Sequence, residues 1–501
     1  MSLLSLFTTL ALASIALTKP VSYPRVPCTP RSQTISWGPC SFPNLGSSPI
    51  ECGILFVPVD YTSPALNETF GLPLFRSRAT KPVTPSKGSI LFNFGGPGYE
   101  AVQSLNSLAD FLHLGVVNTL RFSCFDTPAD RLIAAYKFPI LAIGATDVAL
   151  VDTWASTQVY SNICQTKNNN TNRGGVIGTA YVARDMMRIV DALNEDGLLR
   201  FWGFSYGSLL GETVAAMFPD RIDRLVLDGV VNGHNYYHRQ GVDVDQLLSA
   251  DDAFLGVLDQ CITAGPAKCA LATVNSTAAD LAKALNRLAE EIRTAPIAVG
   301  DTVINFTFVK ELLFIVIKYP SDVANAALHI NNLLHRQNLT GVVDYYKSLQ
   351  ASIAMGDDDA IWGIKCSDTF PRSKELSEVM PDIEHMSNTS STFGPYVASV
   401  TTICANWPFE AKERYAGDFK VKTRFPILFV GNTYDPATPV ASARNMSASF
   451  EGSVVLEQHG FGHASLSQLS ACTTTNLQAY FVNGTLPASG TVCEVDASLF
   501  K

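Results

Sequence analysis

The feature of this sequence that most constrains its fold is a serine between two glycines, in the run Gly203-Phe-Ser-Tyr-Gly207. Apolar residues at 198–204 predict a strand before it, and the pattern of 206–218 predicts a helix directly after it. Ser205 would then stand exposed on a sharp strand-to-helix turn, where glycines leave room for a close approach of the backbone. In this context the run predicts a catalytic nucleophile.

Strands and helices alternate on both sides of this turn. The predicted strands are rich in apolar residues and lie at 54–59, 72–76, 89–94, 224–227, 425–430 and 453–456. Helical spacing of apolar residues marks 178–193, and a further helix is predicted near the end of the chain, around 474–482. This alternation predicts an α/β fold with a mostly parallel sheet and helices on both of its faces.

The pattern changes between 233 and 407, where it is helical. Helices are predicted at 244–258, 278–292, 308–317, 322–334 and 342–354. We therefore predict a core whose first half is 19–232 and whose second half is 408–501, with a helical cap at 233–407 inserted between them.

A serine hydroxyl needs a base to become a nucleophile, and the base needs a third group that fixes its tautomer. When the serine lies on a turn of this kind, the acid and then the histidine follow it in the chain. Asp435 and His463 each follow a predicted strand, so we predict a triad of Ser205, Asp435 and His463. His459 is the alternative base and Asp228 the alternative acid.

The tetrahedral intermediate of such chemistry needs two preorganised N–H donors. The N–H of Tyr206, directly after the nucleophile, is one candidate. The second is assigned to Gly96, in the run Gly95-Gly-Pro-Gly98 that follows a predicted strand. The intervening Pro97 has no N–H and can only stiffen the loop.

The N-terminus predicts a secreted protein. Residues 3–17 form an apolar run followed by a small-residue cleavage site, so 1–18 is predicted to be a signal peptide. Eight glycosylation acceptors accompany it, at Asn67, Asn169, Asn275, Asn305, Asn338, Asn388, Asn445 and Asn483. No later segment approaches the roughly 18 apolar residues of a membrane span. We expect an extracellular glycoprotein without a membrane span.

Eleven cysteines fit an oxidising compartment, where disulfides are the default use of cysteine. Short spacings favour the local pairs Cys40–Cys52, Cys124–Cys164, Cys261–Cys269, Cys366–Cys404 and Cys472–Cys493. Cys28 is then left over. The sequence has no C-x-x-C and no His/Cys cluster with zinc-ligand spacing, so no metal or other cofactor is expected.

Composition limits the classes of partner. Lys plus Arg is 36 and Asp plus Glu is 45, which gives a net charge of −9 with no basic block. A nucleic-acid partner is therefore not expected. Because 47% of the residues are apolar and only 16% are charged, the chain can bury a large core and is not predicted to be disordered.

Several motifs together resemble a known family. They are Gly95-Gly-Pro-Gly98, Phe201-Trp-Gly-Phe-Ser205-Tyr-Gly207, Ala215-Ala-Met-Phe-Pro-Asp-Arg221, Leu225-Val-Leu-Asp-Gly229, Ile364-Lys-Cys-Ser-Asp368 and Asp435-Pro-Ala-Thr-Pro439. With them the chain resembles secreted α/β-hydrolases of the prolyl aminopeptidase and tripeptidyl aminopeptidase type, in their fungal branch. Gly460-Phe-Gly-His463 with Cys472, Gly484 and Cys493 looks like that family's C-terminal module. The resemblance implies a serine exopeptidase that acts on free N-termini, with Ser205, Asp435 and His463 at the triad positions.

The sequence departs from the family's pattern in two places. Phe94 stands where related loops often have His, which removes one polar partner of the loop. In the family, a further core strand ending in an Asp-Pro-Arg-Gly turn follows the helix after this loop. Here residues 112–124 pass directly to the region beyond that turn, and about a dozen residues of the family pattern are absent. Either 116–122 forms a short replacement strand or the fold is impaired, since a lost strand leaves backbone groups unpaired.

Three functions follow as hypotheses. The first is an aminopeptidase, which should hold the ammonium group of its substrate with carboxylates of the cap; Asp368 and the acidic run 357–359 are candidates. The second is a secreted esterase acting on small or polymeric esters. The third is a catalytically silent or impaired protein of the same fold. The intact Ser, Asp and His set argues against the third.

Overall fold

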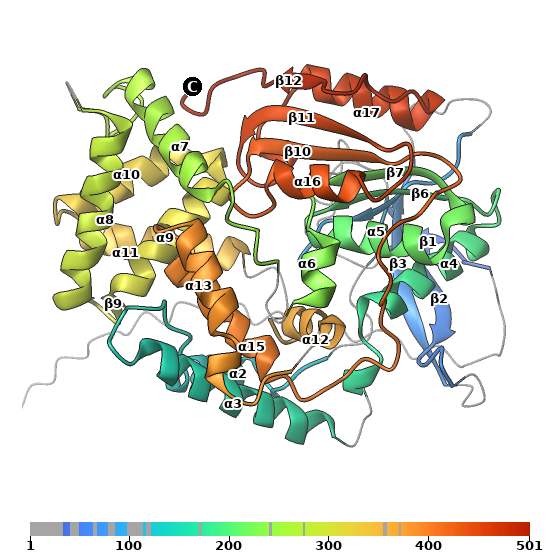
Figure 1. Cartoon of the computed structure of the whole chain (residues 1–501), viewed down its shortest axis with the longest axis horizontal. Helices are drawn as coiled ribbons and strands as arrows, with labels where there is room; N and C mark the ends of the chain where they lie inside the picture. The colour runs from blue at the N-terminus through green and yellow to red at the C-terminus, as the bar shows by residue number, and fades with distance from the viewer. Residues whose placement is uncertain are drawn as a thin grey trace, which may run out of the picture.

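The computed structural model describes residues 34–40, 50–63, 68–78, 86–97, 114–116, 122–169, 173–239, 243–273, 276–353, 358–369 and 372–501. The predicted signal peptide, Cys28, Asn67 and Asn275 lie outside these ranges. A twisted sheet with its covering helices forms one side of the molecule, and a group of helices forms the other (Figure 1).

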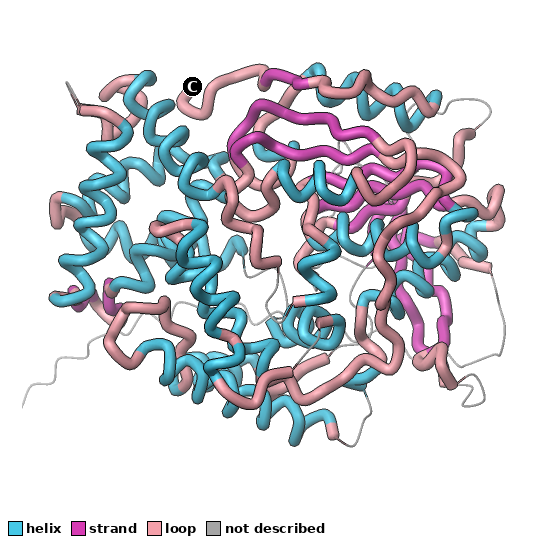
Figure 2. The backbone as a smooth tube through the Cα atoms, viewed as in Figure 1, coloured by secondary structure: helices cyan, strands magenta, loops and turns pink. Residues whose placement is uncertain are grey.

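The central sheet has six parallel strands in the order β12-β11-β10-β7-β6-β4 (magenta in Figure 2). Their bounds are β4 Leu91–Asn93, β6 Leu199–Phe204, β7 Ile222–Asp228, β10 Leu428–Tyr434, β11 Val454–Phe461 and β12 Val492–Glu494. The predicted parallel sheet is therefore confirmed.

Alternate residues of these strands belong to two separate apolar clusters, because successive side chains point to opposite faces of a sheet. Leu227 and Phe429 pack with α4 (Thr179–Leu193), α5 (Tyr206–Met217) and α16 (Val440–Ser447). Val226 and Val430 pack instead with α17 (Ala471–Asn483). Helices therefore cover both faces, as the sequence predicts.

A second sheet pairs four strands antiparallel in the order β1-β2-β3-β5. They are β1 Gly38–Pro39, β2 Ile50–Pro58, β3 Thr69–Ser77 and β5 Leu114–Val116. A strand thus exists where the core was expected to lack one, but it has three residues and overlaps the predicted range 116–122 only at its first residue. Within the described residues, no ladder joins β5 to β4, so the two sheets stay separate.

Helices fill the chain between β7 and β10. They are α6 Gly233–His238, α7 Ala250–Ala264, α8 Ala278–Thr294, α9 Phe306–Lys318, α10 Val323–Leu334, α11 Leu339–Ile353, α12 Asp358–Asp368, α13 Met380–Thr389, α14 Gly394–Val397 and α15 Thr401–Ala405, with a small hairpin of β8 Ile297–Val299 and β9 Thr302–Ile304. Many of them share an apolar cluster around Phe254, Leu285, Leu313 and Phe393. Two earlier helices are α2 Pro128–Lys137 and α3 Ala149–Asn168, and α3 lies beside α15 (Figure 1).

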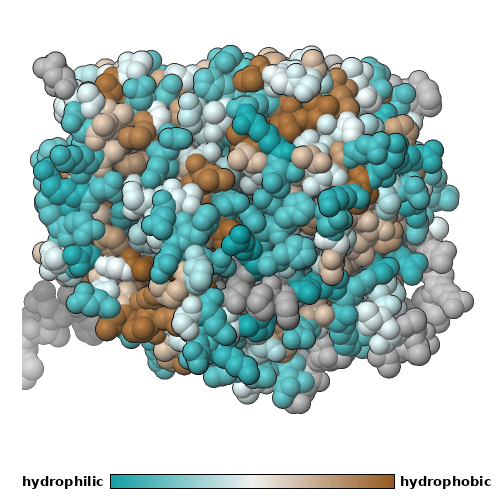
Figure 3. Space-filling view, viewed as in Figure 1, coloured by the Kyte–Doolittle hydropathy of each residue, from teal (hydrophilic) through white to brown (hydrophobic). Residues whose placement is uncertain are grey.

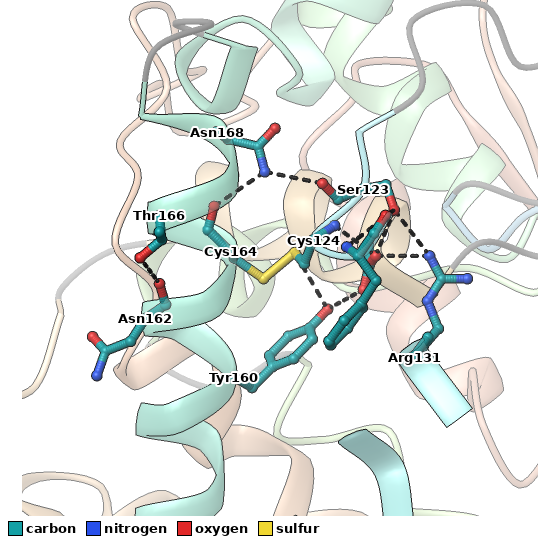
Figure 4. Close-up of a disulfide and its surroundings, with 10 residues drawn as sticks. Ser123, Cys124, Arg131, Tyr160, Asn162, Cys164, Thr166 and Asn168 are labelled. Atoms are coloured by element: carbon teal, nitrogen blue, oxygen red, sulfur yellow. Dashed lines mark hydrogen bonds and ion pairs between the residues drawn. A yellow bond between two sulfur atoms is a disulfide. The ribbon is translucent and has the colours of Figure 1, made fainter. Parts of the chain in front are cut away.

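Each of the five predicted cysteine pairs is a disulfide in the structure. Cys124–Cys164 attaches the segment before α2 to α3, and Figure 4 shows its surroundings. Beside it, the Asp359 carboxylate accepts hydrogen bonds from the Cys124 N–H (2.8 Å), the Tyr160 hydroxyl (2.7 Å) and the Arg131 guanidinium (2.7 Å). The last residue of the acidic run is therefore a buried anchor at the start of α12 and not a solvated loop residue.

The surface carries most of the glycosylation acceptors that the structure describes. Asn169, Asn338, Asn388, Asn445 and Asn483 are exposed. Asn305 is partly buried, and its side-chain oxygen accepts from the Phe308 N–H at the start of α9. Polar residues cover most of the face in Figure 3, with hydrophobic residues in separate patches. Among the described helices, none combines the length and the apolar character needed to cross a membrane.

Candidate active site

Ser205 occupies a strained turn between β6 and α5, with φ 57° and ψ −121°. The flanking glycines allow this turn because a Cβ on either would collide with backbone. A Cβ on Gly203 would lie 2.2 Å from the Gly207 carbonyl oxygen, and one on Gly207 would lie 2.5 Å from the Asn93 carbonyl oxygen. The two glycines of the sequence motif are therefore required by the close approach of β4, β6 and α5.

Asp435 follows β10 and His463 follows β11, and the structure brings the two side chains together. His463 Nδ1 lies 3.1 Å from Asp435 Oδ2 and 3.2 Å from Oδ1. The buried carboxylate also accepts from the N–H groups of Ala437, Thr438 and Ala464, each at 2.9 Å. Burial alone would raise the pKa of Asp435, but the His463 charge and these donors outweigh it and lower that pKa. The contact fixes Nδ1 as a donor and leaves Nε2 for a proton transfer.

Asp228, the alternative acid, connects the serine turn to the histidine loop. Its carbonyl accepts from the Ser205 N–H (2.9 Å), and its carboxylate accepts from the N–H (2.9 Å) and hydroxyl (2.5 Å) of Ser465. Burial raises the pKa of Asp228 to about 6. The acid that contacts His463 is Asp435. Among the described residues no hydrogen bond joins Ser205 Oγ to His463, a contact that in free enzymes often closes only with substrate bound.

The alternative base, His459, lies within β11 and not in the loop after it. Its side chain is exposed, and its Nδ1 lies 3.0 Å from the Glu494 carboxylate on β12. It therefore faces a neighbouring surface acid instead of Asp435.

The glycine loop after β4 lies against the nucleophile. A Cβ on Gly95 would lie 3.0 Å from the Ser205 Cβ, and both Gly95 and Gly96 have positive φ, 104° and 105°. The Gly95 N–H donates to Asn93 Oδ1 at 3.0 Å. Phe94 stacks between Phe92 and Phe204. Asn93, which the sequence analysis did not single out, thus supplies a side-chain hydrogen bond to this loop.

Asp368, the predicted contact for a substrate ammonium group, has no exposed surface. Its carboxylate accepts from the Thr179 N–H (2.7 Å) and hydroxyl, at the start of α4, and from the Tyr236 hydroxyl (3.1 Å). The Thr179 hydroxyl in turn contacts the Tyr206 hydroxyl at 2.7 Å. Burial raises the pKa of Asp368 to about 7, against the opposing effect of these donors. This carboxylate is occupied by protein groups.

Two polar residues hold the histidine loop and were missed in the sequence. The Thr438 hydroxyl donates to Asp435 Oδ2 (2.8 Å) and lies 3.0 Å from His463 Nδ1. Asn432 is fully buried, and its side-chain amide donates to the Gly462 (3.0 Å) and Ala464 (2.8 Å) carbonyls. Thr438 lies within the motif after Asp435, so its spacing from the acid was the available signal.

Replacing Thr438 tests this support. We expect Thr438→Val to lower kcat by about 10- to 100-fold with little change in KM, because a hydrogen bond to a charged group contributes about 1.5–3 kcal/mol. Thr438→Ser keeps the hydroxyl and should retain most of the activity. Steady-state kinetics of the two variants give the comparison, and equal losses in both would show that the methyl group matters instead.

In the ranges that the structure describes, no group of three or more His, Cys, Asp or Glu side chains could hold a metal ion.

Two protein-family models match this chain, and each covers a different part of the candidate site. One, described as "alpha/beta hydrolase fold", matches residues 106–253 and includes Ser205. The other, described as "TAP-like protein", matches residues 390–493 and includes Asp435 and His463. The chain has the α/β-hydrolase fold.

Its relatives are named as peptidases and a hydrolase. The serine protease Hip1 of Mycobacterium tuberculosis is 26% identical, over 92% of this chain and 91% of its own. A tripeptidyl aminopeptidase of Streptomyces lividans is 24% identical over 93% and 87%, and the putative hydrolase YuaR of Escherichia coli is 26% identical over 87% and 88%. The resemblance to tripeptidyl aminopeptidases is confirmed. These relatives are bacterial, and the fungal branch stays a prediction.

Proposed function

We propose that this protein is a secreted serine hydrolase, an exopeptidase that removes residues or short peptides from free N-termini through an acyl-enzyme. The observation that carries the proposal is the buried Asp435–His463 pair beside the strained turn of Ser205. The names of the relatives support peptide substrates. The five disulfides support the predicted secretion, since disulfides persist in oxidising compartments.

In the proposed mechanism, His463 transfers protons while Ser205 is acylated and then deacylated. His463 Nε2 takes the proton of Ser205 as its oxygen attacks the scissile carbonyl, and Asp435 stabilises the imidazolium through Nδ1. The N–H groups of Tyr206 and Gly96 receive the oxyanion. His463 then protonates the leaving amine, and water hydrolyses the ester on Ser205 by the same route in reverse.

The buried carboxylates of the helical region favour an esterase as a second candidate function. Asp368 and Asp359, which would hold a substrate ammonium group, are both engaged by protein donors. An esterase of the same fold needs no such carboxylate, so a secreted esterase acting on small or polymeric esters is the second candidate.

The experiment labels the purified protein with a fluorophosphonate, which reacts only with an activated serine. We expect one label per chain, lost in Ser205→Ala, whose fold should be unchanged because the substitution removes one oxygen at a partly buried turn. Absence of labelling in a folded sample would contradict both candidates and favour a catalytically silent protein.

Substrates then separate the two candidates. We expect tripeptidyl or aminoacyl arylamides to be cleaved faster than acyl esters, after allowance for intrinsic ester reactivity. Acetylating the substrate N-terminus should remove most of the activity. Equal rates on acetylated and free peptides would count against the exopeptidase, and activity on esters alone would favour the esterase.

A further inference from the structure

The end of α9 lies directly against the loop of the candidate base. Lys318 is the last residue of this helix, and its carbonyl accepts the backbone N–H of His463 at 2.8 Å. Two residues later, Pro320 packs against Gly462, where a Cβ would lie 2.5 Å from the proline ring. Gly462 has a φ of 91°, a conformation that favours glycine. These two contacts hold the intervening Tyr319 against the histidine loop.

The ring of Tyr319 meets the imidazole of His463. The two ring planes are inclined at 72°, and their centroids lie 6.4 Å apart. The Lys318 ammonium group lies 5.2 Å from the centroid of the tyrosine ring. Aromatic rings attract one another in edge arrangements at this spacing, and cations attract aromatic rings. The tyrosine ring is therefore held beside the candidate base by two neighbours.

Tyr319 nevertheless keeps 36% of its surface exposed. The His463 side chain is only 8% exposed, and its Nδ1 edge is closed by the buried residues Asp435 and Thr438. A substrate can therefore reach the imidazole only along its remaining edges, and the exposed ring of Tyr319 borders them. An apolar substrate group that packs on this ring leaves water, which is favourable.

The proposed mechanism brings one part of the substrate to this ring. His463 Nε2 gives its proton to the leaving nitrogen, and the transfer requires the two nitrogens to lie within about 2.6–3.2 Å. The side chain directly after the scissile bond stands on the carbon next to that nitrogen. The acyl residues extend from the carbonyl carbon on the other side of the bond. A ring in contact with the imidazole is therefore within reach of the first leaving residue.

We propose that Tyr319 forms the wall of a leaving-group subsite, so that the enzyme prefers an apolar, and above all an aromatic, residue directly after the scissile bond. The proposal rests on the hydrolase function proposed above and adds the substrate class on the leaving side. An aromatic side chain fits this subsite best because it adds a contact between rings to the burial of apolar surface. Glycine offers neither contribution.

The experiment compares peptides that differ only in the residue after the scissile bond. They share the acyl part of the arylamide that is cleaved fastest, followed by Gly, Leu or Phe as the C-terminal amide. Competition between the peptides in one reaction, followed by chromatography, measures the ratio of their kcat/KM values. We expect the full-length protein to show a kcat/KM about 10-fold higher for the Phe peptide than for the Gly peptide, with the Leu peptide between them.

A second measurement tests the same subsite without the acylation step. An added amino-acid amide competes with water for the acyl-enzyme. Its amine attacks the ester carbonyl, the bond to the Ser205 oxygen breaks, and His463 carries the proton from the amine to that oxygen. The attacking amine occupies the place of the leaving amine. We expect phenylalanine amide to capture the acyl group about 10-fold more efficiently than glycine amide.

Variants assign the preference to the ring. Tyr319→Ala removes the wall and should bring the ratio of Phe to Gly within about threefold of unity in both measurements. Tyr319→Phe keeps the ring and should keep the ratio. Tyr136→Ala is the matched control, because it removes an exposed tyrosine of α2, and it should keep both the activity and the full ratio.

The outcomes separate the two proposals. Hydrolysis with a ratio near one in the unmodified protein, or with a ratio that Tyr319→Ala retains, overturns the subsite and leaves the hydrolase function standing. Equal loss of the ratio in Tyr319→Phe and Tyr319→Ala overturns the role of the ring. Absence of fluorophosphonate labelling and of all hydrolysis overturns both proposals.

Discussion

Asp435→Asn is expected to lower kcat on the order of 10⁴-fold at pH 7, an effect exceeded only by loss of Ser205 or His463. The Asp435 carboxylate accepts hydrogen bonds from His463 Nδ1, from three backbone N–H groups and from the Thr438 hydroxyl. An amide presents a donor where only acceptors fit, so the imidazole would be held in the wrong tautomer and some of these donors would lose their partner. Single-turnover acylation with an arylamide substrate measures the loss directly.

Asp228→Asn is the matched control because it changes the other buried acid of the site. Asp228 binds Ser465 and does not fix the histidine tautomer, so we expect a loss of at most about 100-fold, arising from displacement of the loop. Thermal unfolding of both variants shows how much of each loss comes from destabilisation. A larger kinetic effect at Asp228 than at Asp435 would reverse the assignment of the acid.

Stability is expected to fall as the pH rises from about 4 to about 7.5. Glu212, Asp228, Asp243 and Asp368 are at most 3% exposed. Burial raises the pKa of Asp228 to about 6 and those of Asp243 and Asp368 to about 7, and it raises the pKa of Glu212 well above its usual value. Between pH 4, near the usual pKa of a carboxyl group, and these raised pKa values, the folded state therefore binds more protons than the unfolded state. The free energy of unfolding then decreases as the pH rises across this window. Since one unit of pKa corresponds to about 1.4 kcal/mol, we expect a decrease of several kcal/mol.

Glu212→Gln tests the contribution of one of these groups. Glu212 lies in α5, its carboxylate oxygens have no hydrogen-bond partner among the described residues, and a Cβ on Gly233 would lie 2.6 Å from one of them. Glutamine has the same shape and cannot ionise, so the variant should lose stability less steeply between pH 5 and 7.5 in thermal or urea unfolding. Glu451→Gln, an exposed partner of Lys422, is the control and should leave the slope unchanged. An identical slope in Glu212→Gln would show that this carboxyl does not titrate in that window.

The elements that the sequence predicts best are those with strong apolar periodicity. The strand and helix on either side of Ser205 and the helix α4 were predicted within about one residue of their bounds. The helix α3 was missed because the residues on its buried face are small or polar, among them Thr153, Thr157 and Ser161. Because threonine and serine give no hydrophobic periodicity, the buried face of this helix can be recognised only from the elements that pack against it.

The residues of the candidate site also differ in how well the sequence predicts them. The sequence predicts Ser205, Asp435 and His463 as the candidate triad because each follows a strand, and parallel strands bring their carboxyl ends to one edge of a sheet. Asn432 acts through hydrogen bonds to the Gly462 and Ala464 carbonyls, about 30 positions later, which no spacing in the sequence records. Asn93 and Thr438 bond to groups two and three residues away, so their spacing was the available signal. Asp368 was assigned to substrate because its partner Thr179 lies 189 positions earlier in the chain, and the pairing exists only after folding.

The helix α12 has a consequence for directed evolution of specificity. Asp359 fixes its start beside the Cys124–Cys164 disulfide, and Asp368 fixes its end on α4. Between them a Cβ on Gly363 would already lie 2.9 Å from Phe122 and Ile177, so the helix has no freedom to slide. Libraries randomised at Asp359, Gly363 or Asp368 should therefore lose most of their members to misfolding.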